Sequence, residues 1–128
     1  MADGSDAARD EVSGMREDAV AGISRDDGSV VVSLAGELDL YNANQVREAL
    51  LECAAESPER LVVDLSAVKF IDSTALGVLV EARSRLANRS GFMLAAPGRE
   101  TKRALEISGL DRHFSVHDTL DDALAASL

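Results

Sequence analysis

The stretch RLVVDLSAVKFIDSTALGVLVEARSRL, residues 60–86, decides the fold, because a strand pattern ends and a helix pattern begins inside it. RLVVDLS is a continuous apolar run bounded by polar residues, which predicts a strand covered on both faces. Phe70 and Ile71 are expected to pack inward. A helix is expected from about Ser73 to Arg89. Its buried face is marked by three- and four-residue spacing of Ala75, Val78, Leu79, Ala82 and Leu86.

The junction between the two patterns carries Asp72, Ser73 and Thr74. A carboxylate oxygen satisfies amides left free at a helix start, so Asp72 is the predicted cap. Ser73 then becomes the first helical residue, and its hydroxyl is not needed for capping. A phosphate there would be tolerated, because the free amides and the helix dipole both favour an anion. Either this is a plain helix start, or Ser73 is modified by another protein.

The apolar arc of this helix is wider than docking on a sheet requires. Leu76, Val80 and Ala87 extend it to about 200°. Either neighbouring helices cover the surplus, or one edge of it is a partner surface beside Ser73.

The segments on both sides of this stretch alternate between strand and helix patterns. AVAGIS (19–24) and VVVSLAGELDL (30–40), separated by RDDGS, predict a hairpin. NANQVREALLECAAESP (42–58) predicts a helix that opens with a capping box of Asn42 and Gln45. GFMLAAP (91–97) and HFSV (113–116) predict strands. RETKRALEISGL (99–110) predicts a helix that stops at Gly109, and DTLDDALAASL (118–128) predicts a last helix capped by Asp118 or Thr119.

The resulting order, β-β-α-β-α-β-α-β-α, predicts one α/β domain. Its strand-helix-strand units favour parallel pairing, while the opening hairpin is antiparallel. We expect a small mixed β-sheet of about five strands with about four α-helices packed on it. Residues 1–17 are polar and show no sustained hydrophobic periodicity, which predicts a flexible N-terminal tail. Residues 18–128 are expected to form the domain.

Composition narrows the class of partner. The formal net charge is −10, from 23 acidic and 13 basic residues, so phosphate backbones and anionic lipid surfaces repel the chain. We therefore expect a protein partner or a cationic surface, with no nucleic acid and no membrane. One cysteine, Cys53, excludes an internal disulfide and is expected to be a small buried side chain in a reducing compartment. No membrane-length apolar stretch or signal-peptide pattern occurs, which predicts a cytoplasmic protein.

The parts of an enzyme site are largely missing. Ser73 lacks the Gly-x-Ser-x-Gly flanks, no His-Asp relay is evident, and no Gly-Lys-Ser or Gly-Lys-Thr loop occurs. His113 and His117 have a four-residue spacing that would suit a metal only on a helix, whereas their segment predicts a strand. We expect no catalysis, no metal and no cofactor. A small hydrolase acting through Ser73 is the enzymatic alternative.

Four segments in order resemble a known family. They are LAGELDLYNANQVREAL (34–50), RLVVDLSAVKFIDSTALGVLVEA (60–82), FMLAAPGRETKRALEISGLDRHFSV (92–116) and TLDDALAA (119–126). They resemble the STAS domain, and specifically the bacterial anti-sigma factor antagonists. One signature position departs from the family, where a glycine is replaced by Ala75, and alanine predicts a stiffer helix start.

The resemblance implies partner switching. The unphosphorylated antagonist binds an anti-sigma factor, a serine kinase with a histidine-kinase-like ATP-binding fold, and so frees a sigma factor. ATP is bound by that kinase, which phosphorylates the antagonist and thereby releases it. A PP2C-type phosphatase restores binding. We expect a monomer or weak dimer.

The resemblance also implies the residues of the switch. Ser73 is the acceptor, and Thr74 is a lesser acceptor or a hydrogen-bonding neighbour. Glu37 and Asp39 lie beside the site, or are only a polar strand end and a helix start. The implied partner-binding set is Glu37, Asp39, Asp72, Ser73, Thr74, Ala75, Leu76, Gly77 and Val78. The alternative is a STAS module that is never phosphorylated and serves as a scaffold in a lipid-transport or stressosome-like complex.

Overall fold

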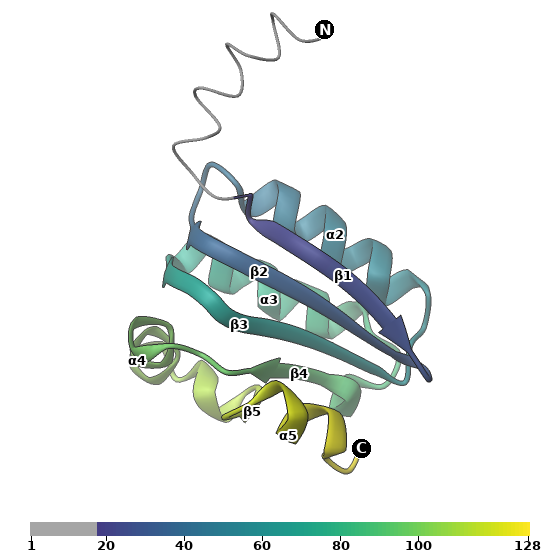
Figure 1. Cartoon of the computed structure of the whole chain (residues 1–128). Coiled ribbons are helices and arrows are strands. Elements are labelled where there is room, and N and C mark those ends of the chain that lie inside the picture. Colours follow the sequence, from purple (N-terminus) through teal and green to yellow (C-terminus); the bar gives the residue numbers. More distant parts are fainter. Residues whose placement is uncertain (1–17) are drawn as a thin grey trace, which may run out of the picture.

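A computed structural model of the chain describes residues 18–128, so the expected tail, residues 1–17, lies outside the described residues. The predicted order of strands and helices is confirmed (Figure 1). The strands are β1 (Val20–Asp26), β2 (Ser29–Leu38), β3 (Arg60–Ile71), β4 (Phe92–Ala95) and β5 (Ser115–His117). The α-helices are α2 (Ala43–Ala55), α3 (Ser73–Arg85), α4 (Arg99–Ser108) and α5 (Leu120–Ala125), with 3-10 turns η1 (Arg89–Gly91) and η2 (Leu110–Arg112).

The strands form one mixed sheet in the order β1-β2-β3-β4-β5. β1 pairs antiparallel with β2, and the other neighbours pair in parallel. The expected hairpin turns at Asp27 and Gly28, both with positive φ, as in the two-residue turns that suit the twist of paired strands. The carboxyl ends of β2, β3, β4 and β5 therefore share one edge, to which the β2 and β3 arrows point in Figure 1. We call it the carboxyl edge.

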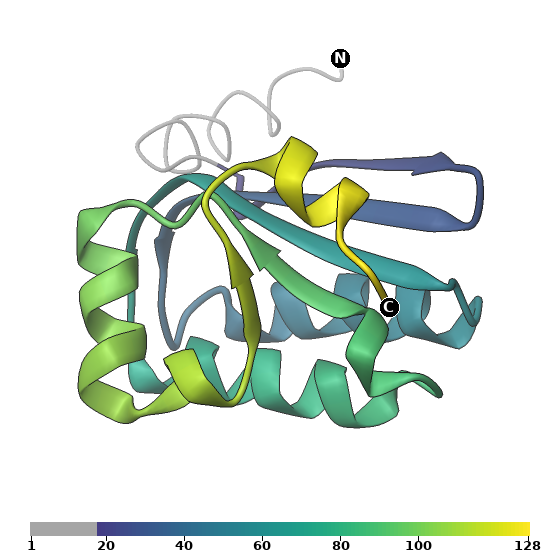
Figure 2. The ribbon, with the colours of Figure 1, turned by 90° about the horizontal axis from the view of Figure 1, so that it is seen from below.

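Helices cover both faces of the sheet. α2 and α3 lie side by side on one face, and α5 lies on the other (Figure 2). On the α2 and α3 side, Leu61 and Val63 of β3 enter the main core, while Val62 packs with Ala123 of α5 in a second cluster. The apolar run in β3 is thus explained by burial on both faces, as predicted.

The helix ends were predicted correctly from the local sequence in one case and incorrectly in two. α3 ends at Arg85, earlier than expected, and Leu86 is extended and buried. The capping box at Asn42 is wrong, because Asn42 makes no side-chain cap bond and the Gln45 amide donates to Asp18 instead. The predicted end of α4 is confirmed, with Gly109 in the left-handed conformation.

Two other expectations concern α2 and α5. Thr119, the second of the two expected caps, caps α5 by accepting from the amide of Asp122 at 3.0 Å. Cys53 is buried in the main core, and burial raises the pKa of its thiol, which favours the uncharged, inert form. Within residues 18–128, no helix is both long and apolar enough to cross a membrane.

Candidate functional site

Asp72 opens helix α3 as the sequence predicted. Its Oδ1 accepts a hydrogen bond from the amide of Ala75 at 2.9 Å, and its backbone is extended, as at an N-cap. Ser73 is therefore the first helical residue, and capping leaves its hydroxyl unused.

The Asp72 carboxylate also bonds the loop that follows β2. Oδ2 of Asp72 accepts from the amide of Leu40 at 3.2 Å, and the amide of Asp72 donates to the carbonyl of Leu38 at 3.0 Å. Leu40 belongs to the loop of residues 39–42, which joins β2 to α2 and which we call the switch loop. Two turns that are distant in sequence thus form one unit at the carboxyl edge.

The switch loop is also fixed internally. The amide of Asp39 donates to Oδ1 of Asn42 at 2.9 Å, and the amide of Tyr41 donates to Oδ1 of Asp39 at 3.0 Å. The side-chain amide of Asn42 donates to the carbonyl of Glu37 at 2.8 Å. The side chain of Asn42 therefore bonds the loop backbone and not the first turn of α2, which is why the capping-box prediction is wrong.

An irregularity in β2 presents Glu37 to solvent. Gly36 has φ 78°, which suits glycine because it has no Cβ, and the register with β3 shifts between Gly36 and Glu37. As a result Glu37 is exposed while Leu38, the next residue, is fully buried. The glycine of the Gly-Glu-Leu-Asp segment thus has a structural role that its spacing did not reveal.

The candidate site residues divide into an exposed and a buried set. Ser73, Thr74, Gly77 and Glu37 are exposed, and Asp39 and Asp72 are partly exposed. Ala75, Leu76 and Val78 are buried in the main core, at 1%, 7% and 8% exposure. Neighbouring elements thus cover much of the wide apolar arc of α3. The accessible candidate surface reduces to the exposed and partly exposed residues, and the methyl group of Ala75 faces the core.

Three exposed apolar side chains at this edge were not among the predicted site residues. Leu40 and Tyr41 stand in the switch loop, and Phe70, expected inside, is half exposed while Ile71 is buried. Successive strand residues point to opposite faces, so Phe70 and Ile71 do not share the core. The apolar pair Leu-Tyr between a strand end and a helix start was the sequence signal for the first two.

The histidines lie in a different part of the fold. His117 Nε2 is 2.9 Å from Ser115 Oγ on β5, and the ring of His113 packs edge-on against Phe114. Among residues 18–128, no group of three or more His, Cys, Asp or Glu side chains is arranged to hold a metal ion.

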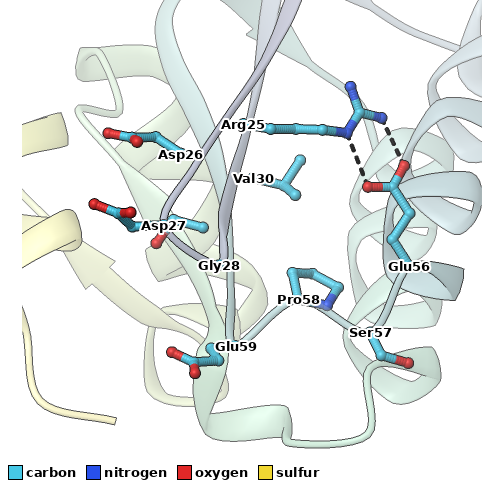
Figure 3. A pocket seen from close by; sticks show the side chains of 10 residues that line it. Arg25, Asp26, Asp27, Gly28, Val30, Glu56, Ser57, Pro58 and Glu59 are labelled. Atoms are coloured by element: carbon cyan, nitrogen blue, oxygen red, sulfur yellow. Dashed lines mark hydrogen bonds and ion pairs between the residues drawn. The ribbon is translucent and has the colours of Figure 1, made fainter.

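A hollow lies at the opposite edge of the sheet (Figure 3). Its lining comes from the hairpin turn and from the segment after α2, including Gly28 and Pro58. Arg25 and Glu56 form a bidentate salt bridge there, with Nε to Oε1 at 2.8 Å and Nη2 to Oε2 at 2.6 Å. This pair joins β1 to the end of α2, so the hollow is the space left between these two connected elements.

The sequence profile of the STAS domain matches residues 21–123. The chain belongs to the STAS domain family. This STAS domain is 39% identical over 97 residues to the anti-sigma-F factor antagonist RsfB of Mycobacterium tuberculosis, with 76% of this chain and 80% of RsfB covered.

Solved STAS structures agree with the fold. An anti-sigma factor antagonist from Mycobacterium paratuberculosis is 40% identical with a TM-score of 0.76, covering 80% of this chain and 88% of that one. SpoIIAA of Bacillus, solved in a phosphorylated form, shares the fold at 21% identity and a TM-score of 0.61, over 80% of this chain and 95% of that one.

Proposed function

We propose that this STAS domain is an anti-sigma factor antagonist that is switched by phosphorylation of Ser73. The unmodified domain binds an anti-sigma factor and so releases a sigma factor. The phosphorylated domain dissociates from the anti-sigma factor. The observation that carries the proposal is that Ser73 is exposed at the start of α3, directly after Asp72, whose carboxylate bonds both that helix start and the switch loop. The identity to RsfB supports the class of partner.

Electrostatics explains how one phosphate would act on binding and not on folding. Phosphorylation adds about −1.5 to −2 charges, next to Asp72 and at the edge that also carries Glu37 and Asp39. The amino end of α3 favours an anion, by about 0.3–1 kcal/mol at an exposed site. An interface would have to bury or oppose that dianion, and a misplaced charge there disfavours binding by several kcal/mol. The phosphorylated form of SpoIIAA is a domain of this fold that carries phosphate and stays folded.

The catalytic steps belong to the partners in this proposal. The anti-sigma factor is a serine kinase with a histidine-kinase-like fold that binds ATP, and a PP2C-type phosphatase reverses its action. The chain itself needs no cofactor and performs no catalysis. Thr74, exposed and adjacent, is the secondary acceptor.

The test is titration calorimetry of the wild type, Ser73→Ala and Ser73→Glu against the anti-sigma factors of the same organism. We expect the wild type and Ser73→Ala to bind, and Ser73→Glu to bind at least tenfold more weakly with a similar Tm. Ser90→Glu is the matched control, because Ser90 is exposed and lies in η1, next to the amino end of β4.

Incubation with ATP and the binding partner, followed by mass mapping, completes the test. We expect one phosphate on Ser73 in the wild type, and none at that position in Ser73→Ala. A complex that forms while the chain stays unmodified would instead support the scaffold function. Equal binding by the wild type and Ser73→Glu would overturn the switch.

A further inference from the structure

The switch loop exposes two large apolar side chains next to each other. Leu40 is 69% and Tyr41 86% exposed, which are high values for side chains of this size. Single exposed apolar residues are common and need no explanation. Two in succession, on a loop bonded to the residue that precedes Ser73, form a defined feature of the carboxyl edge.

The backbone that carries these side chains is fixed by hydrogen bonds. The switch loop is bonded through Asp39, Asn42 and Asp72. Such a loop loses little conformational freedom on binding, so more of the contact energy contributes to affinity. A disordered loop with the same sequence would not have this property.

The charges around the loop indicate the chemistry of the surface that it fits. Three carboxylates, those of exposed Glu37 and of partly exposed Asp39 and Asp72, lie at this edge together with the exposed cation of Lys69, so the surface beside the apolar pair has an excess of negative charge. A complementary surface therefore combines an apolar pocket with basic side chains at its rim. Tyrosine is among the residues most often found at the energetic centre of interfaces, whereas leucine is not.

We propose that Leu40 and Tyr41 are the apolar anchors of this domain and that they insert into an apolar pocket rimmed by arginine or lysine on the anti-sigma factor. The inference rests on the proposed function and adds to it the residues that supply affinity. Asp72 fixes both Leu40 and the start of α3, so the anchors and Ser73 belong to one rigid unit. A partner that covers the anchors places Ser73 at the same interface, where a phosphate opposes binding.

The test measures binding of Tyr41→Ala, Leu40→Ala and Tyr41→Phe to the anti-sigma factor. We expect Tyr41→Ala to raise Kd by about 30-fold or more, and Leu40→Ala by about fivefold or more. Tyr41→Phe keeps the ring and should stay within about threefold of the wild type. Ile107→Ala is the matched control, because Ile107 is 76% exposed on α4, outside the switch loop. It should leave Kd unchanged.

A kinetic measurement separates anchoring from a structural role. With the anti-sigma factor as kinase, Tyr41→Ala should raise KM for phosphorylation of Ser73 and leave kcat within about twofold, because an anchor contributes to binding of the partner and not to the chemistry at the reacting hydroxyl. The Tm of every variant should match that of the wild type, since the replaced side chains are exposed.

The outcomes distinguish this inference from the proposed function. Wild type that binds, with Ser73→Glu impaired but Tyr41→Ala and Leu40→Ala unchanged, overturns the anchors and leaves the switch intact. Wild type that binds no anti-sigma factor overturns both. A similar loss of affinity in Ile107→Ala would also overturn the anchors, since apolar truncation anywhere would then have the same effect.

Discussion

The amide of Leu40 and the carboxylate of Asp72 are joined by a hydrogen bond of 3.2 Å, although 32 positions separate the two residues. The other oxygen of Asp72 caps α3 through the amide of Ala75 at 2.9 Å. One side chain therefore fixes the loop after β2 and the helix after β3. Substitution of Asp72 can separate its bond to the loop from its role as the cap of α3.

Asp72→Ala should remove both bonds, and Asp72→Ser only the bond to Leu40, because a hydroxyl caps well but provides a single oxygen. Loss of the cap in Asp72→Ala should lower the free energy of unfolding by about 0.5–2 kcal/mol, measured by urea denaturation. Asp72→Ser should lose less. Hydrogen exchange at the Leu40 amide should be faster in both variants. Equal stability loss in the two would show that the loop bond, and not the cap, is the main contribution.

Two glycines should respond in opposite directions to alanine. A Cβ at Gly91 would clash with the carbonyl oxygen of Glu59, so Gly91→Ala forces the backbone to move. Overpacking of this kind destabilises by about 1–3 kcal/mol. Gly77 is exposed within α3, and a Cβ there would meet nothing within 4 Å beyond its own stretch of helix, so Gly77→Ala should stabilise by about 0.5–1 kcal/mol. Denaturant midpoints check both, and a stabilised Gly91→Ala would contradict the packing argument.

The order of elements could be predicted because each one carries its own pattern. β3 is apolar on both faces, and Asp72 and Gly109 are recognisable helix-end residues. The exposure of Phe70 was missed because both faces of β3 are covered along its first half, whereas near its end the face that carries Phe70 is open, and that cover depends on neighbours remote in sequence. Local propensity alone does not contain that information.

The candidate site was only partly predictable for a similar reason. Ser73 stood out because Asp72 already caps the helix. The burial of Ala75, Leu76 and Val78 depends on the packing of α3 against α2 and the sheet. The bond between Asp72 and Leu40 depends on the register of β2 with β3, in which Leu38 pairs with Ile71. A one-residue change in that register would remove the bond.

Thr101 is a buried residue whose substitution should stabilise the fold. Its side chain is 1% exposed in α4, and its Oγ1 has no hydrogen-bond partner among residues 18–128. A buried hydroxyl without a partner is unfavourable by about 1–3 kcal/mol. Thr101→Val replaces it with a methyl group of similar shape, so the free energy of unfolding should rise by up to about 1 kcal/mol. Thr101→Ala is the control, because it removes the hydroxyl but leaves a small cavity. A fall in stability for Thr101→Val would indicate that the hydroxyl is satisfied in solution.

The ion pair between Arg25 and Glu56 should give stability that depends on pH. Hydrogen bonding to the Arg25 guanidinium lowers the pKa of the Glu56 carboxyl, below its unfolded value of about 4.3. The contribution is therefore present above about pH 4.3 and is lost as pH falls through the folded pKa. Glu56→Gln should have a lower Tm than the wild type at pH 7, and the two should converge near pH 2.5. Since both side chains are substantially exposed, the difference should be small and should shrink in 1 M salt. Glu52→Gln, which removes a carboxylate from the last turn of α2 without touching the pair, should not reproduce this pattern. A Tm difference that persists at pH 2.5 would mean that packing of Glu56, and not its charge, joins β1 to the end of α2.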